Sequence, residues 1–228
     1  MASSNTGLGL LGVPRNIRDK IYQPLLVIPH PLYLFSDGAS LKVGLFAPDR
    51  PSQWLALLHV NRQLRNEAVK TLYGSHQFVL VDTTRIQTNL LQSFLDLIGP
   101  INAGYLRHVC INFPVVVTDS QQEMKTLHVA EIDLLGLRLI REKCPGLTTL
   151  EMYVHSENSR GLATTATTMT AAQSEVSQNT MAALAQVDAE LKTIPSLEKV
   201  TIRLFSGPLA LEVAQLVESF GWHVLPGR

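Results

Sequence analysis

The chain has few cysteines, few aromatic residues and no excess of either charge, and each shortage excludes a class of proteins. Its 228 residues include two cysteines, Cys110 and Cys144, which are too few for the disulfide framework of a small secreted domain. Lysine plus arginine and aspartate plus glutamate number 19 each, so the formal net charge is zero. Without a basic excess, and with aromatic residues at 6%, the sequence does not favour binding to nucleic acid.

The sequence also lacks a long hydrophobic run and a targeting segment. No stretch approaches the ~20 apolar residues that a membrane-spanning helix requires. The opening MASSNTGLGLLGVPR has no charged start, and its apolar run is shorter than that of a signal peptide. We therefore expect an intracellular protein of the cytoplasm or nucleus with no membrane partner. A hydrophobic share of 46% is enough for a sizeable core.

Motifs for catalysis, cofactor binding and metal ligation are missing or out of context. GLGLLG at residues 7–12 has the spacing of a dinucleotide-binding motif, but no strand precedes it. The seven histidines show no metal-binding spacing, and Cys110 and Cys144 belong to no Cys-x-x-Cys pair. Carboxylates such as Glu151 are expected to be solvated. We therefore nominate no catalytic, cofactor-binding or metal-ligating residue, and we predict that the protein is not an enzyme and has no cofactor.

One enzymatic alternative stays open on the sequence alone. An active site without a sequence motif would require a deep pocket in which a histidine or cysteine meets a carboxylate. A flat surface around His108, Cys110 and His128 would count against that alternative.

The first ordered element is predicted to be a short amphipathic helix, after a flexible tail at residues 1–12. Pro14 suits the first helical position, where its missing N–H costs nothing. Val13, Ile17 and Ile21 recur every four residues, which predicts an apolar face. Pro24 is expected to end or kink the helix. The charged residues are expected to cover the other side of the helix: Arg15, Arg18, Asp19 and Lys20.

A hairpin and a helix–strand unit are predicted next. LYLF and LKVGLF flank SDGAS, which predicts two strands joined by a turn that includes Asp37-Gly38. Ser52 is the expected N-cap of a helix over about residues 53–73. Gly74 is expected to close that helix in the left-handed conformation, so that the strand HQFVLVD follows at once.

The C-terminal half contains a repeated pattern. LRHVCINF (106–113), LTTLEMYV (147–154) and LEKVTIRL (197–204) each place apolar residues three, five and seven positions after a leucine. A helical segment precedes each of them, at residues 86–98, 122–143 and about 175–193. The chain ends with a further helix, a stop at Gly221 and an edge strand. This order predicts parallel strands joined by right-handed crossovers.

Together these elements predict an α/β fold. A short N-terminal helix and hairpin are followed by a mainly parallel sheet with helices on one side, similar to an irregular leucine-rich repeat. Residues 13–83 and 84–228 would form the two parts of one compact domain. The Ser-, Thr- and Ala-rich stretch at residues 156–178 is predicted to be a mobile loop, with a lid or a phosphorylation site as the functional alternative.

Three stretches carry a family resemblance. GVPRNIRDKIYQPLL, LLHVNRQLRNEAVKTLYGSHQFVL and FLDLIGPINAGYLRHVCINFP together resemble the fungal F-box-like proteins, over about residues 11–115. That family begins with an LPxEIRxxIY helix and continues with an RxIRxEAxxxxYgxNxF helix-to-strand unit and an IGpxNxxxIRxI segment. The residues on the middle motif are Arg62, Arg65, Glu67, Tyr73, Gly74 and Phe78.

The resemblance implies a non-enzymatic protein-interaction module that serves as a substrate receptor of a cullin–RING ubiquitin ligase. In such receptors the N-terminal helices dock on a Skp-type adaptor, and the C-terminal part holds a substrate protein. The partner-binding surface of this chain would include Val13, Pro14, Ile17, Ile21 and Leu25.

The main alternative is a structural or regulatory binding protein with no link to a ubiquitin ligase. It would be favoured if Ile17 and Ile21 were buried against the chain's own sheet, because they could not then dock an adaptor. Arg62 and Arg65 would pair with acidic groups or cap carbonyls within the fold, or else form a surface site for an acidic partner.

Overall fold

The computed structural model describes residues 9–37, 42–81, 84–118, 127–155, 162, 171–205 and 207–227. Residues 1–8 of the predicted tail and Gly38 of the predicted turn lie outside the described residues. Most of the predicted loop at residues 156–178 also lies outside the described residues. Its last part is helical, since helix α5 begins at Ala171.

Seven strands of the described chain form one sheet, in the order β2-β1-β3-β4-β7-β8-β9. β1 and β2 are antiparallel, and every other neighbouring pair is parallel. The fold is therefore α/β, as predicted, although the hairpin that was expected to precede the sheet forms part of it. The strands are β1 (Leu32–Asp37), β2 (Lys42–Phe46), β3 (Gln77–Leu80), β4 (His108–Asn112), β7 (Thr149–Val154), β8 (Lys199–Leu204) and β9 (His223–Pro226).

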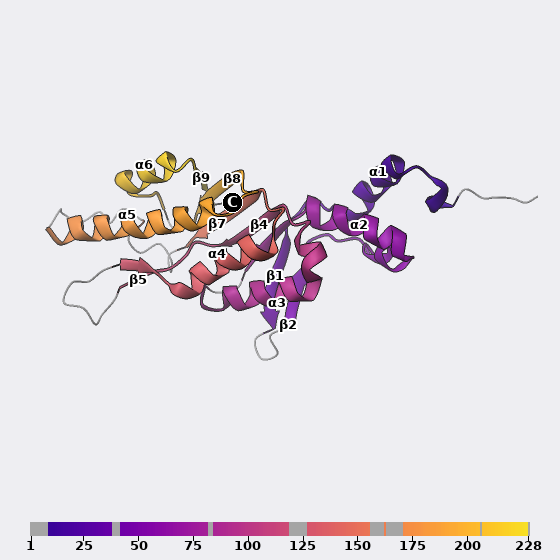
Figure 1. The fold of residues 1–228 in the computed structure, drawn as a ribbon, viewed down its shortest axis with the longest axis horizontal. Coiled ribbons are helices and arrows are strands. Elements are labelled where there is room, and N and C mark those ends of the chain that lie inside the picture. Colours follow the sequence, from indigo (N-terminus) through magenta and orange to yellow (C-terminus); the bar gives the residue numbers. More distant parts are fainter. Residues whose placement is uncertain are drawn as a thin grey trace, which may run out of the picture.

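The helices that connect the parallel strands lie on one face of the sheet. Each crossover steps to the adjacent strand in the same direction, and right-handed crossovers of this kind place successive helices side by side. Contacts between consecutive helices agree with that arrangement (Figure 1). The helices are α3 (Thr84–Ala103), α4 (Glu131–Lys143), α5 (Ala171–Lys192) and α6 (Leu211–Ser219). The likeness to an irregular leucine-rich repeat stays a prediction.

Alternation along the three repeat strands separates an apolar face from a polar one. The positions three, five and seven residues after each leucine are in the core or pack against it, and Val109, Leu150 and Ile202 are each at most 1% exposed. Val200 and Leu204 of the third strand are half-buried. The parallel register aligns Cys110 with Glu151 on adjacent strands. Because successive side chains of a strand point to opposite faces, these two lie on the other side of the sheet from the core.

The N-terminal half contains α1 (Arg15–Leu26) and α2 (Arg62–Ser75), which lie together at one end of the molecule, beyond the end of the sheet (Figure 1). Pro24 does not end α1, which continues to Leu26. The helix retains its last turn because Tyr22 and Leu26 are fully buried, which offsets the hydrogen bond that Pro24 cannot donate.

The predicted start of α2 was wrong. Residues 53–61 form a turn and a short 3-10 helix, η2 (Ala56–His59), and Gln53 has a left-handed φ of 60°. The helix begins at Arg62, because the Asn61 side chain accepts a hydrogen bond from Leu64 N at 2.8 Å and so caps it. Ser52 is therefore not the N-cap.

The predicted end of α2 was also displaced. Gly74 lies inside the helix and does not take the left-handed conformation, which the described glycines adopt at Gly99, Gly207 and Gly221. The C-cap of α2 is instead His76, whose Nδ1 lies 2.8 Å from the carbonyl oxygen of Leu72. Its Nε2 accepts from Ile28 N at 3.2 Å, so Nδ1 carries the proton and satisfies a terminal carbonyl.

Two further boundaries differ in detail. Gly99 has φ 77° and interrupts α3, so the helix predicted to end at residue 98 is kinked there and resumes through Ala103. α4 begins at Glu131 and not at residue 122. The preceding chain instead forms an antiparallel pair of short strands, β5 (Val116–Thr118) and β6 (Leu127–Val129).

A core substitution should test the assignment of the repeat positions. Leu150→Ala removes a fully buried side chain and should lower the free energy of unfolding by about 2–5 kcal/mol. Leu97→Ala, at a residue 70% exposed, should change it by less than about 0.5 kcal/mol. Urea unfolding of both variants and the wild type measures the difference, and equal effects would contradict the assignment.

Candidate protein-interaction site

A buried ion pair attaches α1 to α2. Arg18 donates from Nε to Glu67 Oε2 at 2.7 Å and from Nη2 to Glu67 Oε1 at 2.5 Å. The Tyr22 hydroxyl donates to the same carboxylate at 2.7 Å. Two-pronged pairing of a guanidinium with a carboxylate fixes orientation as well as distance. The position and rotation of α1 on α2 are thus set by one acidic residue.

The electrostatics of this pair follow from its partners. The hydrogen bond from Arg18 is the main cause that holds the pKa of Glu67 at about 2. Burial opposes it, and hydrogen bonds from Tyr22 and Gln63 lower the pKa further. Glu67 in turn raises the pKa of Arg18. Both groups therefore stay ionised across the physiological range. The prediction that Arg18 lies on a solvated side of the helix was wrong.

A small apolar cluster completes this attachment. Tyr22 and Leu26 of α1 pack with Leu64 and Ala68 of α2, and all four are at most 2% exposed. This cluster is distinct from the main core between the sheet and its helices. The buried face of α1 is therefore the line Arg18, Tyr22 and Leu26, spaced by four residues.

The residues predicted to bind a partner lie away from that buried line. Pro14, Ile17 and Leu25 are exposed, with Ile17 at 41% and Leu25 at 52%. Val13 and Ile21 are half-buried. The predicted apolar face of α1 is thus only partly covered by the described part of the chain, and Ile17 is not buried against the sheet.

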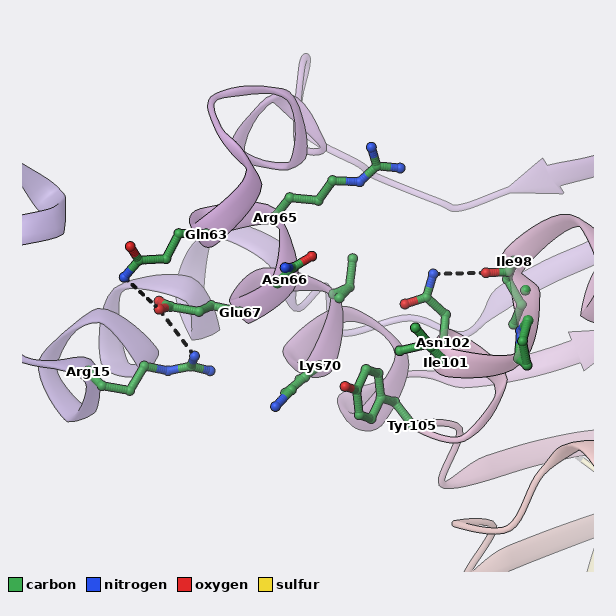
Figure 2. Close-up of a pocket in the computed structure, with 13 residues that line it drawn as sticks. Arg15, Gln63, Arg65, Asn66, Glu67, Lys70, Ile98, Ile101, Asn102 and Tyr105 are labelled. Carbon is green, nitrogen blue, oxygen red and sulfur yellow. Dashed lines mark hydrogen bonds and ion pairs between the residues drawn. The ribbon is translucent and has the colours of Figure 1, made fainter.

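A groove of about 850 Å³ lies beside this helix pair, between α2 and the kink of α3 (Figure 2). Figure 2 shows Arg65 and Lys70 of α2 across from Ile101, with Tyr105 beside Lys70. Lys70 Nζ lies 5.5 Å from the centroid of the Tyr105 ring, within cation–π range. Ile101 is 73% exposed.

The groove has a net positive lining. Arg15, Arg65 and Lys70 contribute three cations, whereas the one acidic group, Glu67, is occupied by Arg18. Arg15 pairs with Asp19 at 2.7 Å and with Glu67 at 3.4 Å. Among the described residues, no acidic side chain forms an ion pair with Arg65 or Lys70. The groove could therefore complement an acidic, partly apolar ligand.

A group of ionisable side chains lies on the polar face of the sheet. His108 Nε2 is 3.4 Å from Glu151 Oε2 and 3.7 Å from Cys110 Sγ. Cys110 and Glu151 are buried, and His108 is half-buried. The sequence placed no site here, because Glu151 was expected to be solvated; it is 4% exposed and also accepts a hydrogen bond from Arg203. The side chain of His128 is outside the described ones.

These three groups do not form a nucleophilic relay. In a cysteine–histidine–carboxylate relay, one ring nitrogen faces the thiol and the other faces the carboxylate. Here the same nitrogen of His108 faces both partners. Burial also raises the pKa of the Cys110 thiol to about 12, whereas a reactive cysteine has a lowered one.

Comparisons with known proteins add no assignment. Neither the protein-family models, nor the curated proteins, nor the solved structures that were compared with this chain gave a match. None of the helices in the described ranges is both long enough and apolar enough to cross a membrane.

The ion pair between α1 and α2 should make the N-terminal region acid-labile. The folded-state pKa of Glu67, about 2, is below its ordinary value of 4.5. Its contribution to stability is therefore complete above pH 4.5 and is lost as the pH falls towards 2. In thermal unfolding, the wild type should have a higher melting temperature than Glu67→Gln at pH 7. This difference in melting temperature should become smaller as the pH falls from 4.5 towards 2. A difference independent of pH would contradict this role of Glu67.

Proposed function

We propose that the chain is a non-enzymatic protein-interaction module that docks on a Skp-type adaptor of a cullin–RING ubiquitin ligase through the exposed face of α1. The observation that carries the proposal is the division of α1 into two faces. Arg18, Tyr22 and Leu26 hold the helix in place, and Ile17 and Leu25 face outwards. A helix so held can present its apolar side chains to a partner at little cost in ordering.

Two further points support this proposal. The sequence of α1 and α2 carries the resemblance to F-box-like proteins, and Glu67, one of its motif residues, fixes the position of α1. The sheet and its helices form a separate apolar core. They would be free to hold a substrate protein while α1 holds the adaptor.

A pull-down with a purified Skp-type adaptor tests the docking face. Ile17→Asp with Leu25→Asp places two carboxylates on the exposed face, where burial of an unpaired charge opposes binding. We expect adaptor binding by the wild type and at least a tenfold loss by the double variant. Because both side chains are exposed, the variant should fold, which circular dichroism checks.

A matched control uses another exposed apolar side chain. Leu97→Asp, at a residue 70% exposed on α3, adds the same charge away from α1 and should leave binding unchanged. Absence of wild-type binding would overturn the proposal, as would an equal loss with Leu97→Asp.

The groove favours a second candidate function, a regulatory binding protein for an acidic segment of a partner, with no ubiquitin-ligase link. The observation behind it is that two cations, Arg65 and Lys70, line the same groove as the exposed Ile101. Charge complementarity selects an extended acidic peptide that also carries leucine side chains.

Fluorescence anisotropy with a labelled Asp/Glu/Leu peptide tests this candidate. Arg65→Glu with Lys70→Glu should weaken binding at least tenfold, and added salt should weaken wild-type binding. Lys199→Glu changes an exposed lysine on β8 and should have little effect. Equal weakening by the groove and control variants would show non-specific attraction instead. Loss of adaptor binding and loss of peptide binding are measured separately, so the two candidates are distinguishable.

A further inference from the structure

The polar face of the sheet brings three metal-ligating side chains to one point. His108 and Cys110 are two residues apart on β4, so they point to the same face. Glu151 on the adjacent parallel strand β7 is the register partner of Cys110. The three ligand atoms, His108 Nε2, Cys110 Sγ and one Glu151 carboxylate oxygen, all lie within 4.8 Å of one another.

The spacing of these atoms suits a tetrahedral zinc ion. With Zn–N, Zn–O and Zn–S distances of about 2.0–2.3 Å, two ligands at a tetrahedral angle lie about 3.3–3.6 Å apart. The observed separations are 3.4 Å from His108 Nε2 to Glu151 Oε2 and 3.7 Å from His108 Nε2 to Cys110 Sγ. Small side-chain rotations would bring the set to bonding distance. One nitrogen facing both a thiol and a carboxylate is the geometry of convergence on a cation.

The surroundings of the three ligands also suit a cation. Gln77, on the neighbouring strand β3, has its side-chain amide nitrogen 2.7 Å from Cys110 Sγ and 3.3 Å from Glu151 Oε2. A half-turn of that amide would direct its oxygen at the same point and offer a fourth ligand. Arg203 donates to the other oxygen of Glu151 and fixes the orientation of the carboxylate, as outer-shell partners of metal ligands do.

Two of the three ligands, Cys110 and Glu151, can carry negative charge. Glu151 forms an ion pair with Arg203, and Cys110 is fully buried beside it. Binding of a divalent ion would release the thiol proton to solvent, so thiolate and carboxylate would together neutralise two of the three positive charges carried by the ion and Arg203. His108 has a side chain 31% exposed, which gives the ion a route from the surface.

We propose that His108, Cys110 and Glu151 bind Zn²⁺, or a divalent transition-metal ion with the same preference for nitrogen and sulfur, on the polar face of the sheet. The site has three protein ligands and a fourth position next to Gln77. Such a site would join β3, β4 and β7 on the face opposite the main core.

Titration of the metal-stripped full-length chain with Co²⁺ tests the site, because cobalt takes the same tetrahedral ligands and is coloured. We expect a thiolate-to-cobalt charge-transfer absorption, which should disappear when added Zn²⁺ displaces the cobalt. Cys110→Ser should abolish that absorption, and His108→Gln should weaken binding at least tenfold. Cys144→Ser, which removes the other buried cysteine, should leave the titration unchanged.

A second readout guards against a variant that fails to fold. Zn²⁺ in excess should raise the melting temperature of the wild type and of Cys144→Ser, but not of His108→Gln, whose partly exposed position tolerates replacement. The proposal would be overturned by a wild type without charge-transfer absorption. An absorption that survives Cys110→Ser, or that is lost equally with Cys144→Ser, would overturn it too.

Discussion

The parallel register of β4, β7 and β8 is the constraint on which most of this structure depends. A shift of one residue in any of these strands would exchange its two faces, placing Glu151 in the core and Leu150 outside it. Burial of the apolar positions against α3, α4 and α5 therefore fixes the register. The same register aligns Cys110 with Glu151, so the polar group on the opposite face is a geometric result of core formation.

The N-terminal region depends on a different interaction. Its four-residue apolar cluster is small, and the orientation of α1 is set by the two-pronged pair between Arg18 and Glu67. Compared with well-packed apolar side chains a buried pair of this kind adds little stability, because desolvation opposes the attraction, whereas removal of one partner leaves an unpaired buried charge and is destabilising. Its role is specific: it determines which side of α1 is covered and which side, with Ile17 and Leu25, faces outwards.

The sequence predicted the repeated strands well because their signal is local. Apolar residues at alternate positions, bounded by glycine and proline, identify a buried strand without knowledge of its neighbours. The orientation of α1 was predicted less well, since Ile17 and Ile21 follow the same spacing of four as Arg18, Tyr22 and Leu26. Hydrophobicity predicted Ile17 and Ile21 to form the apolar face of the helix, with Arg18 on the other side. Arg18 is buried instead because it pairs with Glu67, which is far away in the sequence.

Boundaries and the polar cluster were missed for similar reasons. On sequence context alone a cap at Ser52 and a stop at Gly74 were equally plausible. The contact of Asn61 Oδ1 with Leu64 N and that of His76 Nδ1 with the Leu72 carbonyl oxygen set the boundaries instead. The group of His108, Cys110 and Glu151 joins two strands with a helix between them in the chain, so no short motif records it.

The division of the chain into two apolar clusters has a consequence for its dynamics. A helix held by the ion pairs of Glu67 with Arg15 and Arg18 and by a small apolar cluster is expected to open as a separate unit while the sheet stays folded. The backbone amides of α1 would then exchange with solvent by local opening, faster than those of β4 or β7. A partner that binds only the attached helix would slow that exchange, so recognition and local folding are thermodynamically linked.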